Sequence, residues 1–212
     1  MSYATVYSRA CYGISAPLVT VEVHLSNGLP SMSIVGLASA EVKESRERVR
    51  SALLNSNFEF PARRIIINLG PADLPKSGGR FDLSIALGIL VASGQLNKKL
   101  LNKFEVIGEL ALNGELRSVR GVLTATLAAI EDKNRILMCS EDGQEASLSG
   151  ATNIYCGINL RQITEGLKDA KLLRYKGDNK RDGTPEKVTD LVEVIGNQHA
   201  KRALLISASA GH

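Results

Sequence analysis

The sequence contains no tryptophan, and aromatic residues make up only 4% of its 212 positions. Proteins that bind single-stranded nucleic acid by stacking use aromatic side chains as platforms, so this composition is not typical of that class. No apolar run reaches the roughly 20 residues of a membrane-spanning helix. The first ten residues lack the charged start and apolar stretch of a signal peptide. The sequence therefore predicts a cytoplasmic protein without a membrane anchor.

Cysteine is also scarce. Cys11, Cys139 and Cys156 are far apart, and none belongs to a Cys-x-x-Cys pair or lies near a histidine at ligand spacing. This pattern favours reduced thiols over a disulfide or a metal site, so we predict no metal. The net charge of +4 permits binding to nucleic acid, but a solvated basic face gives the same total.

The pattern of apolar residues predicts strands first and a helix next. Apolar and polar residues alternate in the first strands, with Val19, Val21 and Val23 on one face. Basic residues line one face of the helix, which we interpret as a solvated face in preference to a phosphate-binding stripe. The predicted strands are 4–11, 18–25 and 31–37, as an antiparallel meander, and the predicted helix is 39–57, with Lys43, Arg46 and Arg50 on its basic face.

Residues 61–94 contain a buried strand, a loop rich in proline and glycine, and a helix that is apolar on nearly every side. Such a helix must lie in the middle of a core. Asp82 is placed to cap its first turn and Gly94 to end it. The loop presents Lys76 and Arg80 among glycines, which makes it a candidate functional site.

The second half alternates strands with helices, which predicts an α/β fold with a mixed sheet. Residues 104–119 form a predicted hairpin around Asn113-Gly114, a dipeptide that suits a type I′ turn. The later predicted elements are helices at 122–131, 141–148 and 160–170, the last capped by Asn159, and strands at 136–139 and 154–156.

The composition divides the chain into three parts. Residues 1–175 form the predicted domain, and residues 176–187 contain no apolar side chain, which indicates a polar linker. A new apolar pattern begins at residue 188 and runs to the end of the sequence, so residues 188–212 are expected to begin another module.

Several catalytic motifs are missing. The sequence has no GxxxxGK[ST] phosphate-binding loop, no HExxH zinc motif and no GxSxG nucleophile elbow. We therefore predict no catalytic residue, no resident cofactor and no small-molecule substrate for this chain.

Two segments resemble the proteolytic domain of Lon, PKSGGRFDLSIALGILVASG and VIGELALNGELRSVRGVLTATLAA. In Lon, a serine and a lysine form the catalytic dyad. Aligned with this chain, the serine falls on Arg80 and the lysine on Leu123. Neither can attack a carbonyl or act as a base, and Ser77 and Ser84 stand at other positions, so the resemblance implies a Lon-protease-like, ribosomal-protein domain-2-like fold without peptidase activity.

A second resemblance covers essentially the whole chain. YSRACYGISAPLVTVEVHLSNGLPSMSIVGL, VKESRERVRSALLNSNFEFPARRIIINLGPADLPKSGGRFDLSIALGIL and DLVEVIGNQHAKRALLISASAGH are similar to the ComM/YifB family of magnesium chelatase-like AAA+ proteins. The resemblance implies a hexameric ATPase that uses ATP and Mg²⁺ and remodels DNA by branch migration in natural transformation. The closing segment would begin the AAA+ module before its Walker A loop, with Ile195 and Gly196 on the adenine side.

In this interpretation the Lon-like domain contacts DNA or organises the hexamer. Lys76, Arg80, Arg63 and Arg64 are the candidate phosphate contacts, because cationic side chains neutralise backbone charge. An alternative for Arg80 is a local ion pair, with Asp82 as the first choice of partner. The alternative functions are a residual Lon-type hydrolase and a protein-interaction scaffold without DNA contact.

Overall fold

The computed structural model describes residues 2–169, 171–176 and 190–210. The chain consists of two compact units, Met1–Gly177 and Asp178–His212. Most of the predicted linker, residues 176–187, lies outside the described residues.

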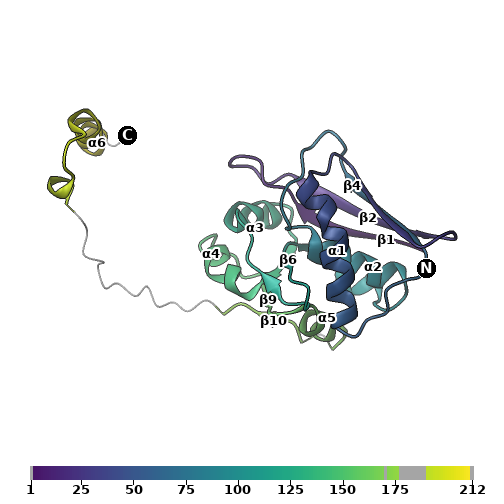
Figure 1. Ribbon diagram of the computed structural model, residues 1–212. Coiled ribbons are helices and arrows are strands. Elements are labelled where there is room, and N and C mark those ends of the chain that lie inside the picture. The colour runs from purple at the N-terminus through teal and green to yellow at the C-terminus, as the bar shows by residue number, and fades with distance from the viewer. Residues whose placement is uncertain (1, 170, 177–189, 211–212) are drawn as a thin grey trace. The chain divides into compact units, whose positions relative to one another are not determined.

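The first unit contains a mixed eight-stranded sheet in the order β10-β9-β8-β5-β1-β2-β4-β3 (Figure 1). The pairs β1–β2, β2–β4 and β9–β10 are antiparallel, and the other neighbours are parallel. The predicted α/β fold with a mixed sheet is confirmed. The strands are β1 (Tyr3–Arg9), β2 (Leu18–Ser26), β3 (Ser31–Val35), β4 (Arg64–Gly70), β5 (Phe104–Val106), β8 (Arg135–Cys139), β9 (Ile154–Gly157) and β10 (Leu173–Arg174).

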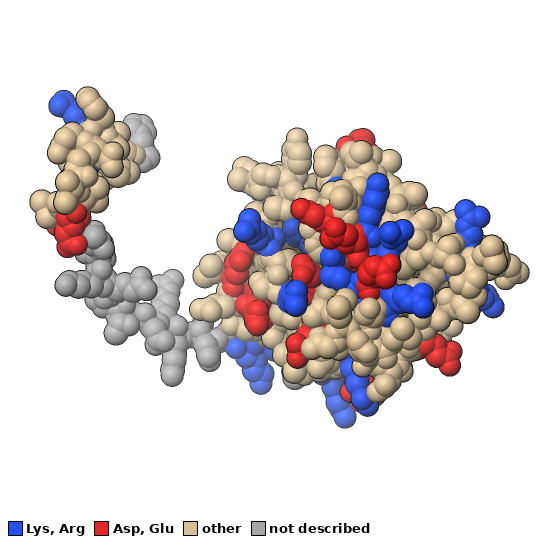
Figure 2. Space-filling model, viewed as in Figure 1, with Lys and Arg blue, Asp and Glu red and all other residues tan. Residues whose placement is uncertain are grey.

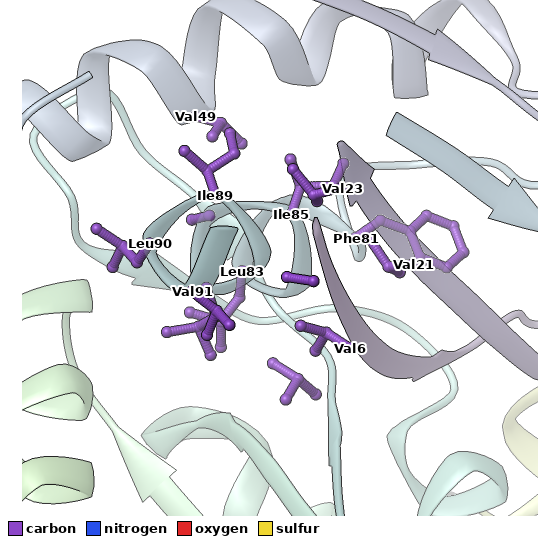
Figure 3. Close-up of a cluster of buried hydrophobic side chains, with 14 of the residues drawn as sticks. Val6, Val21, Val23, Val49, Phe81, Leu83, Ile85, Ile89, Leu90 and Val91 are labelled. Carbon is purple, nitrogen blue, oxygen red and sulfur yellow. The ribbon is translucent and has the colours of Figure 1, made fainter. Parts of the chain in front are cut away.

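Helix α2 (Asp82–Ala92) is the centre of the core, and every one of its residues is buried. It packs on β1, on β2 and on α1 (Ala40–Asn55), and Figure 3 shows its side chains enclosed by Val6, Val23 and Val49. Gly88 lets the helix approach Val23 closely, since a Cβ there would lie 2.7 Å from a Val23 methyl carbon. The prediction of a helix in the middle of the core is confirmed.

Strand β8 separates two apolar clusters. Leu137 and Cys139 face the cluster around α2, whereas Ile136 and Met138 face a cluster formed with α3 (Val122–Glu131) and α4 (Gly143–Ser147). This part of the sheet is therefore covered on both faces. The remaining helices of the unit are α5 (Leu160–Lys168), which begins at the predicted Asn159 cap, and the short 3-10 helices Lys98–Leu101 and Ser140–Asp142.

The predicted three-stranded meander is wrong at its third strand. Strand β3 does not pair with β2; β4 lies between them and pairs with β3 in parallel. The reason is that helix α1 joins β3 to β4, and a strand–helix–strand crossover brings its two strands together in parallel. The predicted alternation in β2 is confirmed, with Val19, Val21 and Val23 buried.

Two local predictions are also corrected. Asp82 does not cap α2: the residue before the helix is Phe81, which makes no side-chain capping bond, and the Asp82 carboxylate accepts bonds from α1 instead. The hairpin turn is not type I′, because Gly114 has a positive φ of 88° but Asn113 does not. The Gly114 N–H bonds to the Ala111 carbonyl within a longer loop between β6 (Glu109–Leu110) and β7 (Leu116–Arg117).

The second unit contains a 3-10 helix, Leu191–Glu193, and α6 (Gln198–Ala210). Ile195 is 97% exposed, and Gly196 has a φ of 79°. None of the helices in the described ranges is long and apolar enough to cross a membrane.

Candidate functional site

A cleft of about 470 Å³ lies beside the N-terminus of α2, where the glycine-rich loop meets the start of α1 and the segment before α3. Two glutamates and two arginines contribute to its wall. The lining residues are Cys11, Glu41, Ser77, Gly78, Gly79, Arg80, Glu109, Ser118, Val119 and Arg120.

Lys76 holds the loop in shape. Its side chain is only 1% exposed, and its ammonium group donates to the Gly36 carbonyl at 2.9 Å and to the Pro71 carbonyl. Burial lowers the pKa of Lys76, and Asp73 partly opposes that effect. Because the ammonium group is bonded to backbone carbonyls, Lys76 ties the loop to the segment that follows β3, and it is not among the residues that line the cleft.

The two glutamates of the cleft pack directly on the glycines. Glu41 accepts a hydrogen bond from the Gly78 N–H at 3.0 Å, and the Glu109 side chain lies where a Cβ of residue 79 would be. Gly79 therefore needs to be glycine for Glu109 to occupy this position.

Arg80 lines the cleft but is itself buried, with an exposed fraction of 6%. Its Nη1 donates to the Arg120 carbonyl at 3.3 Å, whereas Nε and Nη2 have no hydrogen-bond partner among the described residues. Burial lowers the pKa of Arg80, and the adjacent Cys11 thiol and the more distant Asp142 oppose that effect. A guanidinium stays protonated in proteins, so the group is a buried cation. Its Nε and Nη2 make no hydrogen bond of good geometry to the described residues, and the Cys11 thiol, a weak acceptor, is the neighbouring group that favours its charge.

The alternative for Arg80, an ion pair with Asp82, does not form. The Asp82 carboxylate is fully buried and is bound by Arg48 Nε at 2.6 Å, by the Ser45 hydroxyl and by the Leu110 N–H at 3.3 Å. Arg48 comes from the middle of α1, 34 positions earlier in the chain.

The cleft does not hold the groups of a serine hydrolase. Ser77 lines it, but Ser84 is fully buried and donates to the Phe81 carbonyl. None of the lining residues is histidine or lysine, and the ammonium group of the adjacent Lys76 is bonded to backbone carbonyls, so the cleft offers Ser77 no such base. Leu123, at the position of the Lon lysine, is not among the lining residues. The chemistry that the cleft supports is the binding of an anion.

Arg63 and Arg64 lie elsewhere, at the start of β4, and both are exposed. Arg63 lines a cleft of about 560 Å³, and Arg46 and Arg50 line a neighbouring cleft of about 590 Å³. The two clefts share residues 60–62, and Arg50 stacks on the Phe60 ring at 5.1 Å. The structure thus places Arg46 and Arg50 of α1 and Arg63 around two adjoining clefts, whereas Arg64 is exposed but lines neither of them. We name these four residues the arginine surface (Arg46, Arg50, Arg63 and Arg64).

Only Arg63 and Arg64 were candidates from the sequence, because nothing in the spacing places α1 beside residues 60–64. The surface is not of one sign. Glu47 and Glu59 also line its clefts, and Figure 2 shows basic and acidic side chains interspersed over the face that carries α1.

Metal and thiol chemistry have little support in the described ranges. No group of three histidine, cysteine, aspartate or glutamate side chains there is placed to hold a metal ion. The three cysteines are free thiols, with Cys139 and Cys156 buried and Cys11 exposed.

Comparison with known proteins places the chain in a family. A family model described as subunit ChlI of Mg-chelatase matches residues 21–142. Competence protein ComM of Haemophilus influenzae is 48% identical over the whole chain, and the YifB proteins of Salmonella typhimurium and Escherichia coli are 43% and 42% identical. The chain spans 42% of the length of each of these relatives.

A more distant similarity agrees with the Lon-like segments. Lon protease of Chlamydia trachomatis is 26% identical over 140 residues, which cover 62% of this chain and 17% of that protein. The resemblance to ComM and YifB extends over the full sequence, whereas the resemblance to Lon does not. The chain therefore belongs to the Mg-chelatase ChlI family, and it corresponds to the N-terminal part of the family's ComM/YifB proteins.

Proposed function

We propose that this chain is the non-proteolytic, Lon-like N-terminal domain of an AAA+ ATPase that remodels DNA, together with the first residues of the ATPase module. The observation that carries the proposal is the 48% identity to Competence protein ComM along the entire chain. Competence is the uptake and integration of DNA, and the resemblance to the ComM family implies that the whole protein acts on DNA by branch migration. ATP, Mg²⁺ and a hexameric assembly belong to the whole protein in this proposal.

Within the domain, we assign the DNA contact to the arginine surface. Arg46, Arg50 and Arg63 line two adjoining clefts, and Arg64 is exposed next to Arg63 in the chain, so this part of the surface offers guanidinium groups to a phosphate backbone. Lys76 and Arg80, the other two predicted contacts, are 1% and 6% exposed and lie inside the fold. Ile195 and Gly196 are assigned to the adenine side of the ATP site in the complete module.

The test is DNA binding by this chain, measured by fluorescence anisotropy with single-stranded, duplex and four-way-junction DNA at two salt concentrations. The variant Arg63→Ala/Arg64→Ala is expected to bind more weakly and to lower the salt slope by about two, because each phosphate contact contributes close to one. The control is Arg161→Ala/Lys168→Ala, which removes the same charge from two exposed positions of α5. This helix packs on β9, in the other half of the sheet.

Equal weakening in both double variants would assign the binding to net charge and would refute the arginine surface. If the chain binds none of the three DNAs at low salt, the domain has the alternative role in this proposal, which is to organise the hexamer or dock a partner, and DNA contact belongs to the ATPase ring.

A further inference from the structure

We propose that the cleft around Arg80 is a receptor for a single carboxylate group, carried by an acidic side chain of a peptide segment. The carboxylate binds the free edge of the guanidinium formed by Nε–H and Nη2–H. This inference is independent of the DNA contact, because the arginine surface and the Arg80 cleft share no lining residue.

The same edge is used twice elsewhere in this fold. Arg9 donates from Nε at 2.6 Å and from Nη2 at 2.8 Å to the two oxygens of Glu105. Arg48 donates from Nε at 2.6 Å and from Nη2 at 3.2 Å to the two oxygens of Asp82. This side-on fork matches the two oxygens of a carboxylate. Arg80 presents the same two donors, and both are without a hydrogen-bond partner among the described residues.

The acidic groups around Arg80 are already engaged. Glu41 accepts from the Gly78 N–H, and Glu109 pairs with Arg117 Nη1 at 3.6 Å. Asp82 is held by Arg48 and Ser45. Asp142 accepts from the Ser118 hydroxyl at 2.5 Å and from the Val119 N–H at 3.4 Å. A buried cation without a paired anion is unfavourable, so Arg80 is suited to a charge that arrives from outside the chain.

The composition of the cleft favours a peptide over DNA. Glu41 and Glu109 stand in its wall, and they repel a backbone that carries a negative charge at every nucleotide. A single carboxylate is repelled less than a polyanion, and its contact with Arg80 compensates for that repulsion. The two glutamates can pair with cationic side chains or peptide N–H groups on either side of the carboxylate. The volume of about 470 Å³ lies in the range of sites for small ligands and short segments.

In this proposal the Cys11 side chain controls access of the carboxylate to Arg80. Cys11 lines the same cleft as Arg80, and its sulfur lies next to Gly121, where a Cβ would be 3.0 Å away. Because Cys11 is exposed, its side chain can turn away when the carboxylate enters. A bound carboxylate is therefore expected to alter the rate at which an alkylating reagent reaches Cys11.

The experiment is an NMR titration of the ¹⁵N-labelled chain, observing the Nε–Hε signals of its arginines. The probes are a blocked Gly-Asp-Gly peptide, the matched Gly-Asn-Gly peptide, inorganic phosphate and a short single-stranded oligonucleotide. The Asp peptide is expected to shift the Arg80 signal, while the Asn peptide leaves it unchanged. The signals of Arg9 and Arg48 serve as internal controls, because their edges already hold carboxylates.

Two variants sharpen the result. Arg80→Lys keeps the positive charge but loses the two parallel donors of the guanidinium, so it is expected to lower the affinity for the Asp peptide about tenfold. Glu109→Gln removes a charge that repels the carboxylate, so it is expected to raise the affinity for the Asp peptide about two- to fivefold. If Arg80→Lys does not fold, the Nε–Hε signal of Arg80 is assigned by its correlation with the backbone signals of the same residue. The comparison of the Asp and Asn peptides on the wild-type chain then tests the proposal.

The inference is overturned if the Arg80 signal stays in place at millimolar Asp peptide, or if the Asn peptide moves it equally. It is also overturned if only phosphate or the oligonucleotide moves it, which would join Arg80 to the DNA contacts. None of these results bears on the variants of the arginine surface, so the two proposals succeed or fail separately.

Discussion

Replacing Arg48 with methionine is expected to destabilise the first unit by about 2–4 kcal/mol. Methionine keeps much of the length and apolar stem of arginine but removes the two donors that hold Asp82. The Asp82 carboxylate then remains fully buried with only the Ser45 hydroxyl and the Leu110 N–H as partners. Removing one partner of a buried ion pair costs about 3–5 kcal/mol, because the other charge is left uncompensated.

The expected cost lies below that range because the Arg48 side chain is 21% exposed. Water can therefore enter the space that the guanidinium leaves and solvate part of the carboxylate. The double variant Arg48→Met/Asp82→Asn is expected to cost less than the sum of its single variants, by about 1–3 kcal/mol, since the unpaired charge is then absent.

The assay is urea unfolding followed by far-ultraviolet circular dichroism, because the chain has no tryptophan for fluorescence. Arg161→Met is the matched control: Arg161 binds Glu165 at 2.8 Å on the surface of α5, and both side chains are about 60% exposed. Exposed pairs contribute at most about 1 kcal/mol. If Arg48→Met costs no more than Arg161→Met, the claim that the buried pair joins α1 to α2 is refuted.

The cost of Arg48→Met should also depend on pH. Burial raises the pKa of Asp82, and hydrogen bonds from Arg48 and Ser45 oppose that effect. Without Arg48 the pKa of Asp82 rises further above its unfolded value, so the folded variant takes up a proton more readily than the unfolded chain. The difference in stability from the wild-type chain is therefore greatest at neutral pH and shrinks as the pH falls, because protonation removes the buried charge.

Two further predictions follow from packing. Gly88→Ala is expected to lower the free energy of unfolding by about 1–3 kcal/mol in the same urea assay, because the added methyl group meets Val23 at 2.7 Å in a filled core; an unchanged midpoint would contradict the close approach of α2 to β2. Iodoacetamide is expected to label Cys11 alone in the native chain and all three cysteines in denaturant, as counted by mass spectrometry. Burial raises the pKa of Cys139 and raises that of Cys156 to about 12, so rapid native labelling of either would contradict their burial.

Much of the fold follows from local sequence alone. The segment from Asp82 to Ala92 carries apolar side chains on all sides, and a helix of that kind is stable in water only when other elements enclose it. Alternation in β2 determined which face is buried. Gly94 ends α2 with a φ of 81°, a conformation that a side chain disfavours. In each case the deciding interactions lie within a few residues of one another.

Tertiary structure decided the rest. The place of β3 depends on a crossover through α1, and the partner of Asp82 is Arg48, 34 positions away. The sequence identified Lys76 and Arg80 as loop cations, but only the packed structure shows that one is bonded to carbonyls and the other has two donors without a hydrogen-bond partner among the described residues. Pairing between distant residues is selected by how whole elements pack, and the preferences of individual residues carry no record of which partner that packing brings near.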